Sequence, residues 1–434
     1  MNEETIVTAL KKWNFWEKDW DTGIERKEYL NAMPIEDDTV VVIEGPRRAG
    51  KTYIMRQVIK KLIKKGISPL NILFINLEDP QLLCRNSTDL SHIFDVYRRV
   101  FNSQGRIFVF LDEVHTVKDW HSWVHVAREQ GIKIFLSGSN ASLISSDYSS
   151  LLTGRYIPLK VLPLSFREYL LFKNIEISSA EDFLREQETV ERLAKEYLES
   201  GGFPEAVSME EEHRTMWLQQ RFEDVILKDV ASRLGIRKHF ELRLLALFLL
   251  SHVGSTYTYK SLETYLEGKI SNDTIQKYVN AMKDAFLFFE VNKFVPRLRE
   301  IIRSERKAYS VDHGVVRAAA FGISELKGKL LENAVFLELK RRLHFHPAAD
   351  IFYWKDVTGK ETDFVVIERG RVLKAVQVSL DAFSPRTMER EEAGLSSAVR
   401  HLKPEQSLII TLSGREKSKK FPVISFARWA LDLL

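Results

Sequence analysis

The stretch that decides the fold is TVVVIEGPRRAGKTYIMRQVIKKLIKKG, residues 39–66. The β-branched run at residues 39–43 predicts a buried strand, and Ile54, Val58 and Leu62 recur at helical spacing. Between the strand and the helix lies GPRRAGKT, which matches the phosphate-binding pattern G-x-x-x-x-G-K-[ST] in the context that this pattern requires. The stretch therefore predicts an α/β fold with a parallel sheet built around a P-loop.

Each position of this loop has a predicted role in binding ATP and Mg²⁺. Gly45 and Gly50 let backbone amides turn toward a phosphate chain, and Lys51 reaches the β and γ phosphates. Thr52 offers its hydroxyl to Mg²⁺, and the helix N-terminus adds partial positive charge. A glycine turn before a core helix is the structural alternative. The predicted nucleotide-binding residues are Gly45, Pro46, Arg47, Arg48, Ala49, Gly50, Lys51, Thr52 and Tyr53.

A second acidic strand end follows in RIFVFLDEVHTVKDW, residues 106–120. The apolar residues 107–111 place Asp112 and Glu113 at the carboxyl end of a buried parallel strand, where ligands of open α/β sheets bind. We expect Asp112 to hold Mg²⁺ through water and Glu113 to polarise the water that attacks the γ phosphate. The alternative is that both carboxylates cap the helix that follows.

Polar residues downstream are candidates for sensing the γ phosphate. The predicted strand IKIFLSGSN ends in Ser137 and Asn140, although a turn-forming cluster is also typical of such residues. Further on, Arg155 and Arg167 could bring a guanidinium to the γ phosphate, which is worth about 10³ to 10⁵ in rate. Either arginine could instead form a structural salt bridge. Arg155 is the catalytic candidate, acting on its own site or on a neighbour's.

The middle of the chain predicts a helical lid at residues 171–237 and a winged helix of three helices and a hairpin at residues 238–312. If the winged helix reads DNA, one outward face would enter the major groove and a group of arginines would contact phosphates. If it only packs, these side chains form an ordinary solvated face, interrupted by Asp273 and Asp284. The two groups are Asn272, Gln276, Lys277, Asn280 and Lys283, and then Arg297, Arg299, Arg303 and Arg306.

The motifs GPRRAGKT, FLDEVH, SGSN, LTGRYIPLKVLPLSFREYL and YLESGGFPEAV occur in this order. Together they resemble archaeal and bacterial AAA-type ATPases that carry a C-terminal nuclease-like domain and are related to the signal-transducing ATPases. The resemblance covers nearly the whole chain, and the leader GIERKEYLNAM is similar to the segment that precedes the P-loop in that family. It implies ATP binding and slow or partner-stimulated hydrolysis.

The C-terminal part contains GKETDFVVIERGRVLKAVQVSLD, residues 359–381, after a helix that includes Glu332. Glu332, then Asp363 on a strand, then Gln377 on the next strand follow an order that resembles the PD-(D/E)xK nuclease fold. This resemblance implies a divalent metal bound by carboxylates and a lysine that activates water. Gln377 and Ser379 stand where a glutamate and the lysine are expected. Glu332, Asp363 and Gln377 are therefore predicted metal ligands of a site with doubtful cleavage, unless a lysine comes from elsewhere.

Composition sets the broad class. The chain has 434 residues, of which 44% are hydrophobic and 29% charged, as is typical of a soluble protein with several domains. No apolar run approaches the roughly 20 residues of a membrane span, so we expect a cytoplasmic protein without membrane contact. The lone Cys84 excludes an internal disulfide framework. Because 64 basic and 60 acidic residues leave a net charge of +4, any nucleic-acid surface must be a local patch.

The predicted organisation has five parts: a leader at 1–37, a P-loop ATPase core at 38–170, the lid at 171–237, the winged helix at 238–312 and a restriction-endonuclease-like α/β domain at 313–434. The leading hypothesis is a Mg²⁺-dependent ATPase whose nucleotide state controls the C-terminal domains on DNA, a protein partner or a second copy of the chain. One alternative is an ATP-gated endonuclease. The other is a protein-interaction switch with little turnover, which the presence of Glu113 disfavours.

Overall fold

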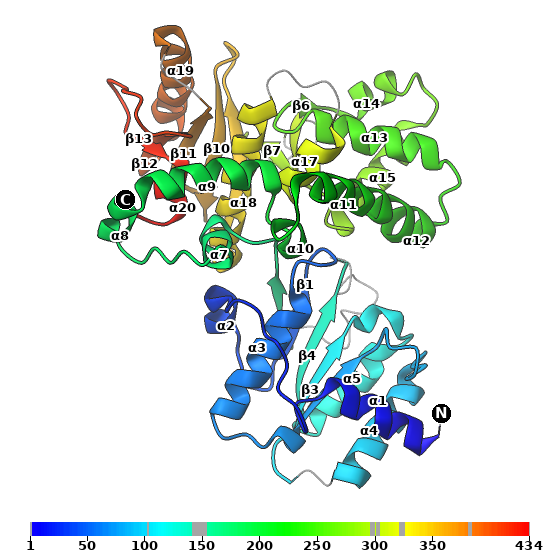
Figure 1. Ribbon diagram of the computed structural model, residues 1–434. Helices are drawn as coiled ribbons and strands as arrows, with labels where there is room; N and C mark the ends of the chain where they lie inside the picture. The colour runs from blue at the N-terminus through cyan, green and yellow to red at the C-terminus, as the bar shows by residue number, and fades with distance from the viewer. Residues whose placement is uncertain are drawn as a thin grey trace. The chain divides into compact units, whose positions relative to one another are not determined.

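The structure, a computed structural model, describes residues 2–101, 104–140, 154–295, 300, 304–320, 326–380 and 384–433. The chain forms two compact units, Met1–Val161 and Leu162–Leu434, which we call the N-terminal and C-terminal units. Figure 1 shows the first in blue and cyan and the second from green to red. None of the helices in the described ranges combines the length and apolarity that crossing a membrane requires.

The N-terminal unit is built on a five-stranded parallel sheet with the strand order β2-β3-β4-β1-β5. The apolar runs that predicted buried strands form its centre, and polar residues follow the carboxyl ends of β1, β3 and β4. This arrangement confirms the predicted parallel α/β fold. The strands are β1 Val40–Glu44, β2 Ile72–Asn76, β3 Phe108–Asp112, β4 Lys133–Gly138 and β5 Tyr156–Lys160.

Helices cover both faces of this sheet (Figure 1). Successive residues of β1 alternate between the two layers, so Val40 and Val42 pack on one side while Val41 and Ile43 pack on the other. Burial on both faces explains why the strands are continuously apolar. One layer contains α1 Glu3–Trp13, α4 Ser87–Phe101 and α5 Trp120–Glu129, the other α2 Lys27–Ala32 and α3 Lys51–Lys64; η1 Pro69–Asn71 and η2 Val114–Thr116 are short connections.

The C-terminal unit contains an eight-stranded sheet with the order β13-β12-β11-β10-β9-β7-β8-β6. Two antiparallel groups, β6-β8-β7 and β9-β10-β11, are joined by the parallel pairing of β7 with β9, through Asn292 opposite Phe352 and Lys293 opposite Tyr353. The strands β12 and β13 extend the sheet in parallel from β11. The strands are β6 Thr256–Tyr257, β7 Phe288–Lys293, β8 Arg306–Ser310, β9 Ala349–Lys355, β10 Glu361–Glu368, β11 Arg371–Ser379, β12 Gln406–Thr411 and β13 Val423–Ser425.

The helices of this unit include those expected from the sequence. Ser271 caps α15 by accepting a hydrogen bond from the Thr274 amide, as its position before an amphipathic run predicted. The helices are α7 Phe166–Phe172, α8 Ala180–Arg185, α9 Gln187–Ser200, α10 Pro204–Val207, α11 Glu211–Asp224, η4 Val225–Ala231, α12 Ser232–Leu234, α13 His239–Ser251, α14 Tyr259–Tyr265, α15 Asn272–Asp284, α17 His313–Ala319, α18 Leu326–His344, α19 Pro385–Leu402 and α20 Phe426–Ala430.

The units differ from the predicted boundaries in two respects. The hairpin strands β7 and β8, expected in a separate winged helix, belong to the same sheet as the strands of the expected nuclease-like domain. Pairing with β9 covers an edge of β7 that an isolated hairpin would leave open. Residues 162–170, expected in the ATPase core, belong to the C-terminal unit, where the Leu164 amide donates to the Gly202 carbonyl over 2.7 Å.

Candidate functional site

The P-loop follows the carboxyl end of β1, and its two glycines are required by the backbone. A Cβ on Gly45, whose φ is 156°, would lie 2.1 Å from the Val161 carbonyl oxygen. Gly50 has a φ of 96°, in the left-handed region that favours glycine, directly before α3 begins at Lys51. These two glycines therefore fix the path of the loop, which leads directly into the N-terminus of a 14-residue helix.

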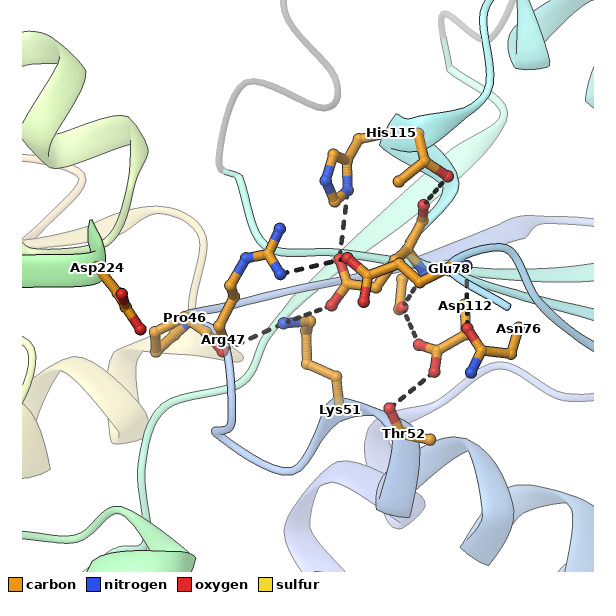
Figure 2. A network of polar contacts seen from close by, with 12 residues as sticks. Pro46, Arg47, Lys51, Thr52, Asn76, Glu78, Asp112, His115 and Asp224 are labelled. Carbon is orange, nitrogen blue, oxygen red and sulfur yellow. Dashed lines mark hydrogen bonds and ion pairs between the residues drawn. The ribbon is translucent and has the colours of Figure 1, made fainter. Parts of the chain in front are cut away.

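Lys51 lies inside this loop. Its Nζ donates to the Gly45 carbonyl over 3.0 Å and lies 3.4 Å from Glu113 Oε1. It also donates to the Pro46 carbonyl over 3.1 Å (Figure 2). The residue is buried, with 4% of its surface exposed. All three contacts are to oxygen atoms, and phosphate oxygens offer the same chemistry to an ammonium group. The lysine is thus already at the predicted phosphate position.

Asp112 and Thr52 meet beside the lysine. Thr52 Oγ1 donates to Asp112 Oδ2 over 2.8 Å, and the Ser137 hydroxyl donates to the other Asp112 oxygen (Figure 2). Burial raises the pKa of Asp112 despite these hydrogen bonds. Within the described ranges, no three His, Cys, Asp or Glu side chains are arranged to hold a metal ion. Mg²⁺ nevertheless fits here, because it commonly uses one carboxylate together with phosphate oxygens and waters.

Glu113 is held at the predicted catalytic position by both its backbone and its side chain. Its φ is 56°, and its amide donates to Ser137 Oγ over 2.9 Å. Oε2 lies 3.2 Å from His115 Nδ1. Burial opposes ionisation, but the hydrogen bond from His115 and the charge of Lys51 outweigh it and lower the pKa of Glu113 to about 2. The capping alternative is not supported, because the Glu113 side chain caps no amide of η2.

Several residues around the loop were not identified from the sequence. Arg26 Nη1 donates to the Ala49 carbonyl over 2.9 Å, and the Arg26 amide donates to Gln57 Oε1 over 3.1 Å. Arg47 Nη1 lies 3.2 Å from Glu78 Oε1 at the rim of the site (Figure 2). For residues before the P-loop, the sequence offered only the resemblance of the leader segment to the same segment of the family. For His115 it offered only the position two residues after Glu113.

The structure places Arg155 away from the loop within the N-terminal unit, and Arg167 belongs to the C-terminal unit. Arg155 precedes β5, whose Tyr156 pairs with Val40 at the amino end of the sheet, while the P-loop follows the carboxyl end. Five strand residues separate these ends, roughly 15 Å. Arg155 instead lies 3.0 Å from Glu129, and Arg167 donates to the Ile177 and Leu431 carbonyls within the C-terminal unit. Action on the γ phosphate of its own N-terminal unit is therefore not supported for Arg155.

Asn140 remains a candidate for the γ-phosphate contact. Gly138 at the end of β4 pairs with Glu44, the residue before the P-loop. Asn140 follows two residues later and so lies at the same edge of the sheet. Beside it, burial raises the pKa of Glu44 to about 7 against the opposing charge of Lys160. The sequence analysis did not identify this carboxylate, which has 3% of its surface exposed.

In the C-terminal unit, the structure brings Glu332 and Asp363 to one lysine that the sequence analysis did not identify. Lys307 Nζ, on β8, lies 3.3 Å from Glu332 Oε1 and 3.5 Å from Asp363 Oδ1. It also lies 2.8 Å from Glu361 Oε1, and its side chain is 2% exposed. We call Lys307, Glu332, Glu361 and Asp363 the buried ion cluster. Burial and the charge of Glu332 raise the pKa of Asp363 to about 7.

Gln377 has a different partner from the other predicted metal ligands. Its Nε2 donates over 2.7 Å to Glu391 on α19, and its buried Oε1 accepts no hydrogen bond from the described residues. Asp363 is oriented by the Val378 amide over 2.9 Å, and Glu332 accepts from the Tyr309 hydroxyl over 2.7 Å. The structure thus joins two of the three predicted ligands through a lysine rather than through the glutamine.

Some side chains of the predicted DNA-reading face form hydrogen bonds or ion pairs with residues of the C-terminal unit. Lys283 pairs with Glu290, and Gln276 donates to Asn272 over 2.7 Å. Arg306 lies 4.0 Å from Glu290 and is largely buried. Lys277 and Asn280 are exposed. The other predicted phosphate contacts lie outside the described residues, namely Arg297, Arg299 and Arg303.

Residues 37–170 match a family model described as an AAA domain. With the parallel sheet and the loop geometry, this match identifies residues 37–170 as a P-loop domain of the AAA class. The chain belongs to the family of a Haemophilus influenzae protein described as an uncharacterized protein, with 31% identity over 365 residues, 82% of this chain and 87% of the relative. An uncharacterized protein of Methanocaldococcus jannaschii is 29% identical over 406 residues, 90% of this chain and 88% of the relative.

The rest of the chain matches models without an assigned role. Residues 191–327 and 327–429 match two domains of unknown function, DUF8612 and DUF4143. Among solved structures, Cdc6p from Pyrobaculum aerophilum is similar to 77% of this chain and 93% of its own, with 10% identity and a TM-score of 0.26. A likeness this distant identifies no residue role. The predicted AAA resemblance is confirmed, whereas the nuclease-like domain stays a prediction.

Proposed function

We propose that the N-terminal unit hydrolyses ATP with Mg²⁺, using Lys51 for the phosphates and Glu113 for the attacking water. The observation that supports this most directly is the buried contact between these two side chains, 3.4 Å apart, beside the hydrogen bond from Thr52 to Asp112. A site for binding alone needs the lysine and the loop. A buried, ionised carboxylate next to the phosphate position adds a group that can orient and polarise water.

Binding of a triphosphate would exchange the partners of Lys51. Phosphate oxygens would replace the Gly45 and Pro46 carbonyls and the Glu113 carboxylate around its ammonium group. Glu113 would then be left with His115 and become available to the water. Bound Mg²⁺, held by Thr52 and Asp112, would neutralise charge on the β and γ oxygens. Asn140 is the proposed side-chain contact to the γ phosphate.

The experiment that tests this proposal compares Glu113→Gln with the wild-type protein. Amide in place of carboxylate preserves shape but removes the basic oxygen, so we expect turnover to fall by about 10²-fold or more while nucleotide binding persists. Phosphate release and binding of a fluorescent ATP analogue measure the two effects separately. Glu129→Gln is the matched control, because Glu129 is an exposed glutamate of the same unit that pairs with Arg155. Equal turnover in Glu113→Gln and wild type would remove Glu113 from the reaction.

We further propose that the nucleotide state controls how the C-terminal unit engages DNA, a protein partner or a second copy of the chain. The two-unit organisation supports this, since an ATPase unit is linked to a larger unit with its own sheet. Mg²⁺-dependent turnover measured with duplex, branched and single-stranded DNA tests the DNA branch. Stimulation by one DNA form would identify the substrate class, and no change with any form would favour a protein partner.

The second candidate function is metal-dependent DNA cleavage at Glu332 and Asp363. The observation that favours it is Lys307, which places a lysine beside both carboxylates. The position where the fold resemblance predicted this lysine holds Ser379 instead. The same geometry limits activity, because the ammonium lies within 3.5 Å of both carboxylate groups that a cation would need. We therefore infer that Lys307 acts as a structural counter-ion and that cleavage is slow or absent.

Nicking of supercoiled plasmid with Mg²⁺ or Mn²⁺ tests this candidate. We expect little product from the wild type, and more from a Gln377→Glu, Ser379→Lys double variant if only charge and a lysine are missing. Asp363→Ala should remove whatever nicking exists, and Asp350→Ala, a change to a carboxylate at the start of β9, is the control. Fast wild-type cleavage that survives Asp363→Ala would place nuclease chemistry elsewhere.

A further inference from the structure

The C-terminal unit has a pocket of about 640 Å³ that the proposed ATPase and nuclease-like sites do not use. It is lined by the end of β7, the turn between β9 and β10, and one side of α19. Its volume is within the range of pockets that bind small molecules or single groups of larger ligands. All of its lining residues belong to this one unit. We call it the basic pocket.

Positive charge dominates the lining of the basic pocket. Five lysines and arginines line it, against one carboxylate, Asp356, in a chain whose basic and acidic residues are otherwise nearly balanced. These five are Lys293, Lys355, Lys360, Arg400 and Lys420. The imbalance is a local patch of the kind that an almost neutral chain needs to attract a polyanion.

Three of these cations have no acidic partner among the described residues. Lys355 and Lys420 each lie 3.7 Å from a glutamate outside the pocket lining, Glu361 and Glu392 respectively. No carboxylate of the described residues lies within ion-pair distance of the other three, which are Lys293, Lys360 and Arg400. Lys360 and Arg400 are exposed, and Lys293 is half-buried. Their charges are therefore available to a ligand.

The single carboxylate of the lining does not cancel this charge. Asp356 accepts hydrogen bonds from the Ser397 hydroxyl and from the Thr358 hydroxyl and amide. The first of these contacts lowers the pKa of Asp356 the most, and the Lys360 amide adds a further hydrogen bond. These donors shape the β9–β10 turn, so Asp356 holds the turn that presents Lys360.

An aromatic wall completes the pocket. Trp354 is half-buried, with ring centroids 5.7 Å from His401 and 6.4 Å from Phe294, and all three residues line the pocket. Its Nε1 is buried and has no hydrogen-bond partner in the part of the chain that the structure describes. The tryptophan thus contributes aromatic surface to the wall of the pocket and no accessible donor.

We propose that the basic pocket binds a single strand of nucleic acid, with Lys293, Lys360 and Arg400 on its phosphates and Trp354 against an unpaired base. This inference rests on the proposed function in which the C-terminal unit engages DNA, and it names the surface and the form of DNA. A single strand fits better than a duplex, because an aromatic side chain can contact the face of a base only when that face is not covered by its neighbours. Phosphates provide the acceptors that arginine and lysine bind.

The test uses the full chain and a labelled 12-nucleotide single strand, with binding followed by fluorescence anisotropy over a range of salt. In the pocket variant, Lys293→Glu, Lys360→Glu and Arg400→Glu are combined. We expect at least about tenfold weaker binding and a salt slope lower by about 2, since each phosphate contact on a single strand contributes about 0.7. Trp354→Leu should weaken binding by about tenfold with an unchanged salt slope, because it removes stacking but no charge.

The matched control combines Arg369→Glu, Arg371→Glu and Lys417→Glu, three exposed residues of the same unit that do not line the pocket. It makes the same change in net charge and should retain most of the binding. ATP turnover and far-UV circular dichroism should be the same in all variants. If the pocket variant does not fold, the three single substitutions are tested in its place. Their separate losses of binding free energy should then add.

Five results distinguish the outcomes. Loss in the pocket variant but not in the control supports the proposal. Equal loss in both variants would reduce the effect to net charge and overturn it. DNA binding that survives the pocket variant but is lost on Lys277→Glu would place the contact on α15, overturning the pocket while keeping DNA as partner. Equal competition by inorganic phosphate or ATP would identify a small-anion site, and no binding of any DNA at low salt would overturn both proposals.

Discussion

Each unit of this protein buries a lysine among oxygen atoms, and the two lysines differ in the groups that contact them. The side chains of Lys51 and Lys307 are 3% and 2% exposed. Lys51 contacts two backbone carbonyls of its own loop and one carboxylate. Lys307 contacts three carboxylates from α18 and β10, and these are distant along the chain.

The difference teaches how to distinguish a ligand site from a structural ion cluster. The partners of Lys51 keep hydrogen-bonding capacity of their own, and phosphate oxygens can take their place around the ammonium. If Lys307 moved, Asp363 would be left as a buried charge without a cation among the described residues, and Glu332 and Glu361 would lose their nearer cation, which is strongly unfavourable. A buried lysine at a helix N-terminus is therefore exchangeable, whereas one that neutralises several carboxylates is not.

The largest expected effect is on stability at Lys307. Lys307→Met keeps the length of the side chain but leaves Asp363 without a cation among the described residues, and it leaves Glu332 and Glu361 only the more distant Lys329 and Lys355. We therefore expect a loss of about 3–5 kcal/mol in the free energy of unfolding. Urea unfolding followed by tryptophan fluorescence measures it. ATP turnover per folded molecule should be unchanged. Lys293→Met is the control, since Lys293 has a similar place on the neighbouring β7 strand but pairs with no described carboxylate. An equally small loss of stability in Lys307→Met and Lys293→Met would show that Lys307 is not a structural counter-ion, and the contrast with Lys51 would disappear.

The next effect is on catalysis at Lys51. Lys51→Ala should lower ATP turnover by about 10² to 10³-fold, because the ammonium stabilises charge on the phosphates in a site shielded from water. Steady-state phosphate release measures this, with Lys60→Ala, on the exposed side of α3, as the control. The loss of stability should be smaller than at Lys307, since Glu113 keeps its contact with His115. A variant that hydrolyses ATP normally would refute the assignment of the P-loop lysine.

A third contrast is in the response to pH. Burial raises the pKa of Asp363 to about 7 from its usual value of 3.8, so between these values the folded state binds a proton that the unfolded chain has released. Stability of the C-terminal unit should therefore fall as the pH rises from about 4 to about 7. Asp363→Asn should flatten this dependence, measured as the urea midpoint at several pH values. The same pH dependence of the urea midpoint in the wild type and in Asp363→Asn would contradict this prediction.

The pKa of Glu113 is shifted in the opposite direction, so its effect on stability has the opposite pH dependence. Its pKa is lowered to about 2 from 4.5, so its stabilising ionisation is complete above about pH 4.5 and is lost only toward pH 2. The pH dependence of turnover between pH 5 and 8 should therefore not come from Glu113. Glu113→Gln should lower turnover by the same factor at both ends of that range, and a factor that changes more than a few fold would contradict the assigned ionisation.

The smallest effect is expected at Arg155. Its ion pair with Glu129 is exposed, with 43% and 54% of the two side chains accessible, so Arg155→Ala should change the free energy of unfolding by less than about 1 kcal/mol. Turnover at low protein concentration should also be unchanged. A loss of turnover that appears only at concentrations where the protein self-associates would show that Arg155 acts on a neighbouring molecule.

Much of the fold could be predicted because its signals are local. The apolar strands of the N-terminal unit, the helix after the P-loop and the Ser271 cap each depend on residues within a few positions of one another. Phosphate binding is local in the same sense, since Gly45, Gly50 and Lys51 act within one loop. Asp112 and Glu113 were found because carboxyl ends of parallel strands share one edge of a sheet.

The sequence by itself thus determined the AAA class of the N-terminal unit and predicted the residues that would surround the phosphates. Only the tertiary structure decided that β7 pairs with β9, that Arg155 lies at the other end of the sheet, and that Lys307 lies 56 residues from Asp363 yet beside it. The physical reason is that periodicity specifies which faces are apolar, but not which distant strands pair to cover them. The contacts of a charged side chain on such a strand are known only when that pairing is known.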